Sequence, residues 1–124
     1  MKGECEILLI DDEADMRIAL AELLEDEGYT VGQAMDGKKG LQFLQDNPKP
    51  KLILLDYMMP EMGGAEFCEK MRANPQWASI PVAIVSAATL SKEKMSIMSV
   101  IAFIEKPIQI EKFLAVVEKF CKDN

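Results

Sequence analysis

Histidine is missing from this chain of 124 residues, and basic residues are fewer than acidic ones. Without histidine, the chain cannot contain a Ser-His-Asp or Cys-His nucleophile pair, a His-ligated zinc ion or a histidine phosphocarrier. Lysine and arginine number 14 against 21 aspartates and glutamates, which gives a net charge of −7. This balance argues against binding to nucleic acid or anionic lipid, because both require clustered basic side chains.

Long apolar runs are also missing. The longest mostly apolar stretch, residues 80–90, is interrupted by Pro81, Ser86 and Thr89. It is much shorter than the ~20 residues that a membrane-spanning helix needs. Near the N-terminus, the run Ile7–Ile10 is too short for the apolar part of a signal peptide. We therefore expect no insertion into a membrane and a cytoplasmic location.

Cysteine pairs are missing as well. Cys5, Cys68 and Cys121 are odd in number and form no CxxC motif. Reduced, mostly buried thiols in a cytoplasmic protein are the interpretation that this spacing favours. The length suits one compact domain over residues 1–124, which can bury roughly two-thirds of its unfolded surface without assistance.

What the sequence does contain is an alternation of short apolar runs with segments of helical period. The runs cover residues 6–10, 30–34, 51–56, 80–85 and 102–105, and the helical patterns cover residues 16–24, 41–44, 67–71, 95–98 and 110–120. Gly28 and Ser91 are typical of a helix end and a helix start. Five strands alternating with five helices predict an α/β fold with a parallel sheet, right-handed crossovers and helices on both faces.

Chemically active side chains stand where the apolar runs end. Asp11 and Asp12 follow the first run, Asp56 ends the third, Ser86 follows the fourth and Lys106 follows the fifth. In an open parallel sheet, ligands bind beyond the carboxyl ends of the strands. Acids at strand ends can simply cap helices or solvate turns, but all five positions in register on one edge favour a functional site.

Three carboxylates at one edge require a cation. Two carboxylates ~5 Å apart repel each other by roughly 3 kcal/mol at an effective dielectric constant of ~20. Hard oxygen ligands with room for water suit Mg²⁺, or alternatively Mn²⁺. Lys106 and the Ser86 hydroxyl can contact the oxygens of an incoming phosphoryl group, while Asp56 acts as the nucleophile. The predicted product is an aspartyl-phosphate.

The whole chain resembles a receiver domain of the response-regulator family, to which the single-domain chemotaxis regulator belongs. The matching segments are Ile10–Glu13, Leu55–Pro60 with Gly63-Gly64, Ser86-Ala87 and Lys106-Pro107. The resemblance implies a flavodoxin-like, doubly wound sheet of five parallel strands in the order 2-1-3-4-5. Five helices complete a three-layer α/β/α arrangement.

The same resemblance implies the roles of the site residues. Asp56 is the phosphoacceptor, and Asp12 and Asp56 are direct Mg²⁺ ligands. Asp11 holds the metal directly or through water, and the backbone carbonyl of Met58 completes the protein ligands. The phosphoryl donor is a partner histidine kinase or phosphotransfer protein, which agrees with the absence of histidine here. Such a domain is not an enzyme beyond its self-catalysed phosphorylation and dephosphorylation.

A conformational switch is also implied by the resemblance. Ser86 and the adjoining Ala87 move toward the phosphoryl group, and Phe103 turns inward; a permanently buried Phe103 is the alternative. The Lys106–Pro107 peptide bond is expected to be cis. Phosphorylation then changes binding to a downstream protein target, in a monomer or a weak phosphorylation-dependent dimer.

Two features differ from the usual family pattern. Met58 and Ala88 occupy positions that often carry polar side chains, which help to place the hydrolytic water. We hypothesise that these apolar residues slow dephosphorylation. The segment between Ser86 and Lys106 has 19 residues, about two fewer than is common, so the helix at Ser91–Met98 is expected to be short.

Two other functions compete with this interpretation. A Mg²⁺-dependent phosphohydrolase of the haloacid-dehalogenase type would use the same nucleophile, but it places a second aspartate where Met58 stands. A flavodoxin-like FMN carrier needs a phosphate-binding loop where Asp11 and Asp12 stand, and these acids would repel phosphate. Whether the chain acts alone or is a fragment of a longer regulator stays open.

Overall fold

The computed structural model describes residues 6–59 and 61–121, so Cys5 and Pro60 of the sequence motifs lie outside the described residues. One five-stranded parallel sheet forms the centre of the molecule, with the strand order β2-β1-β3-β4-β5. The strands are β1 (Glu6–Ile10), β2 (Thr30–Ala34), β3 (Leu52–Asp56), β4 (Val82–Ser86) and β5 (Ala102–Glu105). The predicted fold class and strand order are confirmed.

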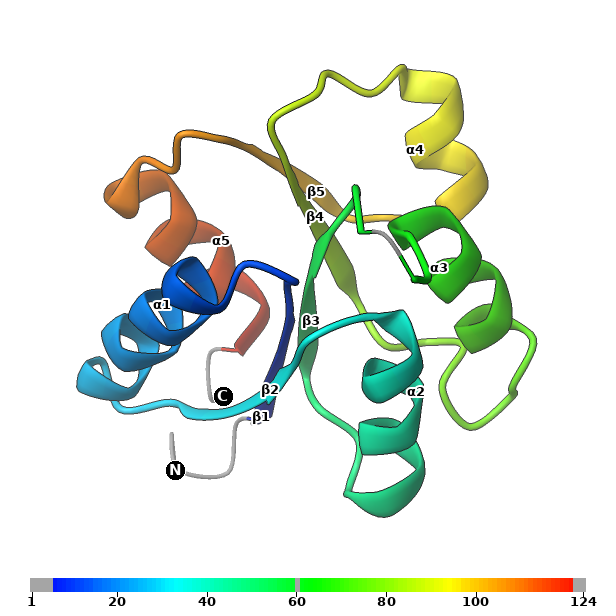
Figure 1. Cartoon of the computed structure of the whole chain (residues 1–124), viewed down its shortest axis with the longest axis horizontal. Helices are drawn as coiled ribbons and strands as arrows, with labels where there is room; N and C mark the ends of the chain where they lie inside the picture. Colours follow the sequence, from blue (N-terminus) through cyan, green and yellow to red (C-terminus); the bar gives the residue numbers. More distant parts are fainter. Residues whose placement is uncertain (1–5, 60, 122–124) are drawn as a thin grey trace.

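Helices cover both faces of this sheet. They are α1 (Ala14–Asp26), α2 (Gly37–Asp46), α3 (Gly64–Arg72), α4 (Lys92–Met98) and α5 (Ile110–Cys121). Helices α1 and α5 lie on one face, and α2, α3 and α4 lie on the other (Figure 1). Each helix follows one strand, and helices α1 to α4 lead back to the start of the next strand, which is why all five strands run in the same direction.

The core consists of two apolar clusters, one on each face of the sheet. Every residue of β3 and β4 is buried, because these strands are covered on both sides. Phe67 of α3 is fully buried in one cluster, and Phe113 of α5 is fully buried in the other. The continuous apolar runs of the sequence are therefore explained by burial on both faces rather than on one.

Local signals in the sequence define several helix ends. The Ser91 side chain accepts a hydrogen bond from the backbone N–H of Lys94 at 3.1 Å and caps α4. Helix α4 has only seven residues, as its short connection predicts. Helix α1 ends at Asp26, and two residues later Gly28 turns the chain with a φ of 97°, in the left-handed region that favours glycine.

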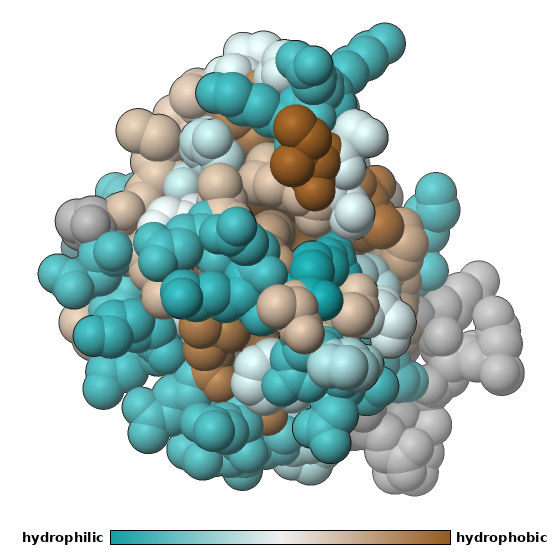
Figure 2. Space-filling view, turned by 90° about the vertical axis from the view of Figure 1, so that its right-hand side faces the viewer, coloured by the Kyte–Doolittle hydropathy of each residue, from teal (hydrophilic) through white to brown (hydrophobic). Residues whose placement is uncertain are grey.

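Across residues 6–59 and 61–121, no helix combines the length and apolar character needed to cross a bilayer. The face formed by α2, α3 and α4 is largely hydrophilic, with apolar side chains in separate small patches (Figure 2). One of the most exposed apolar residues, Ile97, belongs to α4.

We expect the substitution Gly28→Ala to destabilise the protein by about 1–2 kcal/mol, because a Cβ atom is unfavourable in the left-handed conformation. Urea unfolding measures this free energy. Gly28→Asn is the control and should lose less, since asparagine tolerates positive φ better than alanine. Equal stability of the alanine variant and the wild type would contradict this account of the helix end.

Candidate functional site

The backbone ladder of the sheet places Asp11 beside Asp56. Ile10, the last residue of β1, is in register with Leu55 of β3, so the next residue on each strand is an aspartate. The Asp11 N–H donates to the Ala34 carbonyl of β2 at 3.1 Å, which extends the pairing of β1 with β2 by one residue. The position of Asp11 is therefore set by backbone hydrogen bonds from the neighbouring strand.

Three carboxylates gather at this edge, as the sequence predicts. Asp11, Asp12 and Asp56 each bring one carboxylate oxygen to a group in which all three lie within 4.8 Å of one another. Asp11 and Asp56 are nearly inaccessible, with 2% and 6% of their surface exposed, whereas Asp12 is exposed. The cluster is thus buried on one side and open to solvent on the side of Asp12.

Lys106, which follows the edge strand β5, brings positive charge to this cluster. Its backbone N–H donates to the Ser86 carbonyl at 2.9 Å, continuing the pairing of β5 with β4. The ammonium nitrogen lies 3.6 Å from Asp11 Oδ2 and 3.8 Å from Asp56 Oδ2. Burial opposes protonation, but the attraction of Asp11, Asp56 and Glu13 outweighs it and raises the pKa of Lys106.

The pKa of Asp56 is raised, whereas an ordinary ion pair lowers the pKa of its acid. Burial, together with the negative charge of Asp11, raises the pKa of Asp56 from 3.8 to about 6. The positive charge of Lys106 and a backbone hydrogen bond from the Met58 N–H, at 3.4 Å from Asp56 Oδ1, act against this rise without cancelling it. Negative charge at this position is therefore costly without an added cation.

Ser86 lies on the strand next to Asp56 and is fully buried. Asp56 is in register with Val85, so Ser86 stands one residue beyond the acceptor position on β4. Its Oγ accepts a hydrogen bond from the Ala88 N–H at 3.0 Å, which orients the hydroxyl and leaves its proton available for donation. Ala87, between the two, is exposed.

The loop between β3 and α3 returns tightly to the strand end. The Gly64 N–H donates to the Tyr57 carbonyl at 2.9 Å, and a Cβ atom at Gly64 would lie 3.0 Å from Tyr57 Cα. This close approach explains the glycine at position 64. The same loop leaves the Met58 side chain 65% exposed next to the acceptor position.

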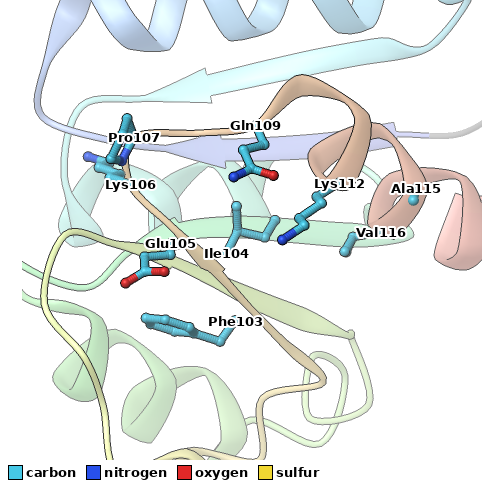
Figure 3. A pocket seen from close by; sticks show the side chains of 9 residues that line it. All are labelled: Phe103, Ile104, Glu105, Lys106, Pro107, Gln109, Lys112, Ala115 and Val116. Atoms are coloured by element: carbon cyan, nitrogen blue, oxygen red, sulfur yellow. The ribbon is translucent and has the colours of Figure 1, made fainter.

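Phe103 lies on β5, three residues before Lys106, and is partly buried. It lines a hollow of about 700 Å³ between β5 and α5. Figure 3 shows that Gln109 and Lys112 extend into this hollow, whereas the Lys106 side chain points away from them. The Lys106–Pro107 peptide bond is cis, as the resemblance predicts.

Two neighbours of the acidic cluster were not predicted from the sequence. Arg17 of α1 donates from Nη1 to the Asp11 carbonyl at 2.8 Å and from Nε to Gln33 Oε1 at 3.1 Å, which joins α1 to the end of β1 and to β2. Glu13 places Oε1 3.4 Å from the Lys106 nitrogen. Lys106 follows Glu13 by 93 residues, so no local pattern reveals this contact.

The donor set suits a hard divalent cation. Three carboxylates supply oxygen ligands within 4.8 Å of one another, and the exposed Asp12 leaves room for water molecules. Burial and the charge of Asp11 raise the pKa of Asp56 even with Lys106 nearby, so a cation bound here would favour the ionised carboxylate. Mg²⁺ and Mn²⁺ match this chemistry better than zinc, because the described site has neither a thiolate nor an imidazole among these donors.

Comparison with known proteins shows where this architecture recurs. The family described as the response regulator receiver domain matches residues 7–118. The DNA-binding dual master transcriptional regulator RpaA of Synechocystis is 36% identical over 111 residues, which cover 88% of this chain and 46% of that protein. The chain therefore spans less than half of the length of this relative.

Solved structures show the same fold. The chemotaxis protein CheY4 of Vibrio cholerae has a TM-score of 0.87 and 26% identity, over 94% of this chain and 98% of that one. The receiver domain of the sensor histidine kinase PA1611 of Pseudomonas aeruginosa, with a magnesium ion coordinated in its active-site cleft, has a TM-score of 0.84. It is 19% identical, over 96% of this chain and 98% of that one.

We expect Asp56→Asn to stabilise the metal-free protein by about 1–2 kcal/mol at about pH 7.5. The folded-state pKa of Asp56 is raised, so the folded protein binds more protons than the unfolded chain between about pH 4 and 6. Stability is therefore lost as the pH rises through this window, and asparagine avoids that loss. Urea unfolding in EDTA at about pH 4 and 7.5 measures the difference.

The exposed Asp15 provides the matched control, since Asp15→Asn also removes one acid but leaves the cluster intact. This variant should follow the wild-type pH dependence. Lower stability of Asp56→Asn than of wild type at neutral pH would contradict the predicted direction.

Proposed function

We propose that this chain, which belongs to the response regulator receiver domain family, accepts a phosphoryl group on the Asp56 carboxylate and thereby changes its binding to a protein partner. One observation carries the proposal: Asp56 and two further carboxylates meet Lys106 at the carboxyl edge of a parallel sheet. The family match favours this function over the phosphohydrolase and the flavin carrier.

Asp56 is the proposed nucleophile. A carboxylate oxygen of Asp56 attacks phosphorus as the bond from phosphorus to the donor breaks, and the donor leaves with that electron pair. For a partner histidine kinase or phosphotransfer protein, the leaving group is an imidazole nitrogen. With a pKa of about 6, Asp56 is largely ionised at neutral pH and therefore able to attack.

Lys106 and Ser86 are proposed to hold the transferred group. Lys106 already lies 3.8 Å from Asp56 Oδ2, so a phosphoryl oxygen attached there comes within reach of its ammonium group. Ser86, held by the Ala88 N–H, can donate its hydroxyl proton to a second oxygen. These contacts stabilise negative charge that develops during transfer.

Asp11, Asp12, Asp56 and the Met58 backbone carbonyl are the proposed ligands of Mg²⁺, with Mn²⁺ as an alternative. When bound, the ion neutralises part of the charge on the phosphoryl oxygens and on the acids. The chain's own contribution is the prearranged set of oxygens. Asp11 is fixed by Arg17 and by the Glu13 N–H, which donates to Asp11 Oδ1 at 2.8 Å.

The response to phosphorylation is proposed to pass through the Ser86–Ala87 loop, Phe103 and the Lys106–Pro107 segment. Phe103 pairs in register with Ile84 of β4 and lines the hollow beside α5. Phe103 is only partly buried and packs against the apolar cluster on the face of α2, α3 and α4. We propose that a downstream protein contacts the surface around Phe103 and thereby distinguishes the phosphorylated from the unphosphorylated protein.

We expect acetyl phosphate and Mg²⁺ to add one phosphoryl group to the wild-type protein, as measured by intact mass. Asp56 attacks phosphorus and acetate leaves, so the mass should rise by one phosphoryl group per chain. Asp56→Asn should show no increase, because the amide is a poor nucleophile. Asp15→Asn, which changes an exposed acid outside the cluster, should be modified like the wild type.

Modification of Asp56→Asn to the wild-type level would contradict the assignment of the acceptor. Continuous release of phosphate from many phosphoesters, without a stable adduct, would instead indicate a phosphohydrolase. Omission of Mg²⁺ with EDTA present should abolish the wild-type adduct, since the acidic cluster then repels the incoming anion.

We expect Met58→Asn to shorten the lifetime of the phosphorylated protein by about twofold to tenfold. Met58 is exposed beside the acceptor, and an amide there can hydrogen-bond the water that attacks phosphorus. Decay of the adduct after removal of the donor measures the rate. Met35→Asn, another exposed methionine outside the β3–α3 loop, should decay like the wild type; a slower Met58→Asn would contradict the hypothesis.

A further inference from the structure

Lys106 is shared by three carboxylates, one of which lies outside the acidic cluster. Its nitrogen is 3.6 Å from Asp11 and 3.8 Å from Asp56, both buried, but it is closest to Glu13, at 3.4 Å. The Glu13 side chain is 64% exposed and belongs to the loop between β1 and α1. Glu13 thus competes for the lysine from the solvent side.

The Glu13 side chain does not cap the helix that it precedes. Glu13 is the N-cap of α1, but its side chain makes no capping hydrogen bond. The caps of α2 and α4, Asp36 and Ser91, accept backbone N–H groups in the ordinary way. The Glu13 carboxylate instead reaches across the site to Lys106, a contact between the first and last loops of the carboxyl edge.

The electrostatics of this contact oppose phosphoryl binding. The Glu13 carboxylate lies 3.4 Å from the Lys106 nitrogen, so it occupies the same ammonium group that a phosphoryl oxygen would use. Glu13 also adds negative charge beside the path of an incoming anion. Its backbone N–H, rather than its side chain, holds Asp11, so loss of the carboxylate leaves that hydrogen bond in place.

We propose that Glu13 is a positioning residue that shares the Lys106 ammonium group with Asp11 and Asp56 in the unmodified protein and slows transfer from small anionic phosphoryl donors. The inference rests on the proposed function of Asp56. The phosphoryl group and Glu13 compete for Lys106, and the negative charge of Glu13 repels the donor. Removal of that charge favours the phosphorylated state without any change in the acceptor.

The test compares wild type, Glu13→Gln and Asp15→Asn, each at a Mg²⁺ concentration shown by titration to be saturating. Intact mass follows adduct formation with acetyl phosphate at low salt and at about 0.5 M salt. Glu13→Gln should react about twofold to fivefold faster than wild type at low salt, the range expected for an exposed ion pair. The difference should shrink at high salt, because exposed charges are screened.

Asp15→Asn removes a charge of the same sign from the first turn of α1. A wild-type rate for Asp15→Asn, beside a faster Glu13→Gln, supports a specific contact with Lys106. Equal acceleration of both variants overturns the proposal, as does a Glu13→Gln rate that is unchanged, slower or equally raised at both salt concentrations. Thermal unfolding checks that both variants are folded.

Failure of this inference can be distinguished from failure of the proposed function. If wild type forms no adduct, or if Asp56→Asn forms one, the acceptor assignment is wrong. If wild type is modified on Asp56 and Glu13→Gln reacts at the same rate, the acceptor stands and the role of Glu13 is rejected.

Discussion

Repulsion among carboxylates at the carboxyl edge of the sheet is the constraint on which the site depends. Asp11 and Asp56 are nearly buried side by side, and Asp12 joins them from the solvent side. Lys106 offsets part of this charge, but burial, together with the charge of Asp11, still raises the pKa of Asp56 to about 6. The site is therefore prepared for added positive charge, and the same arrangement serves both cation binding and phosphoryl transfer.

The sheet makes this charge crowding possible because it holds the acids through the backbone. Strands β3 and β4 are buried along their full length, and packing on both faces prevents the strand ends from separating. The register of Ile10 with Leu55 places one aspartate beside the other, and Arg17 fixes the carbonyl of Asp11. Burial of the apolar core thus offsets the unfavourable free energy of bringing like charges together.

Much of this arrangement follows from local patterns that can be recognised in the sequence. The apolar runs predict the strands because both faces are covered, and Ser91 and Gly28 predict helix ends through their individual conformational preferences. The contact of Glu13 with Lys106 has no such signal, since it joins positions 93 residues apart on different loops. The sequence around an acidic loop residue does not predict which basic side chain it contacts in the fold.

The sequence by itself determined the alternation of strands and helices and the residue types at the strand ends, because these depend on periodicity and on neighbouring positions. It also placed Asp56 and Lys106 on one edge, since parallel strands end on the same side. Only the tertiary structure decided the distances among them, the partial burial of Phe103 and the sharing of Lys106. Those properties depend on side chains from separate segments, whose packing against one another sets both distance and exposure to water.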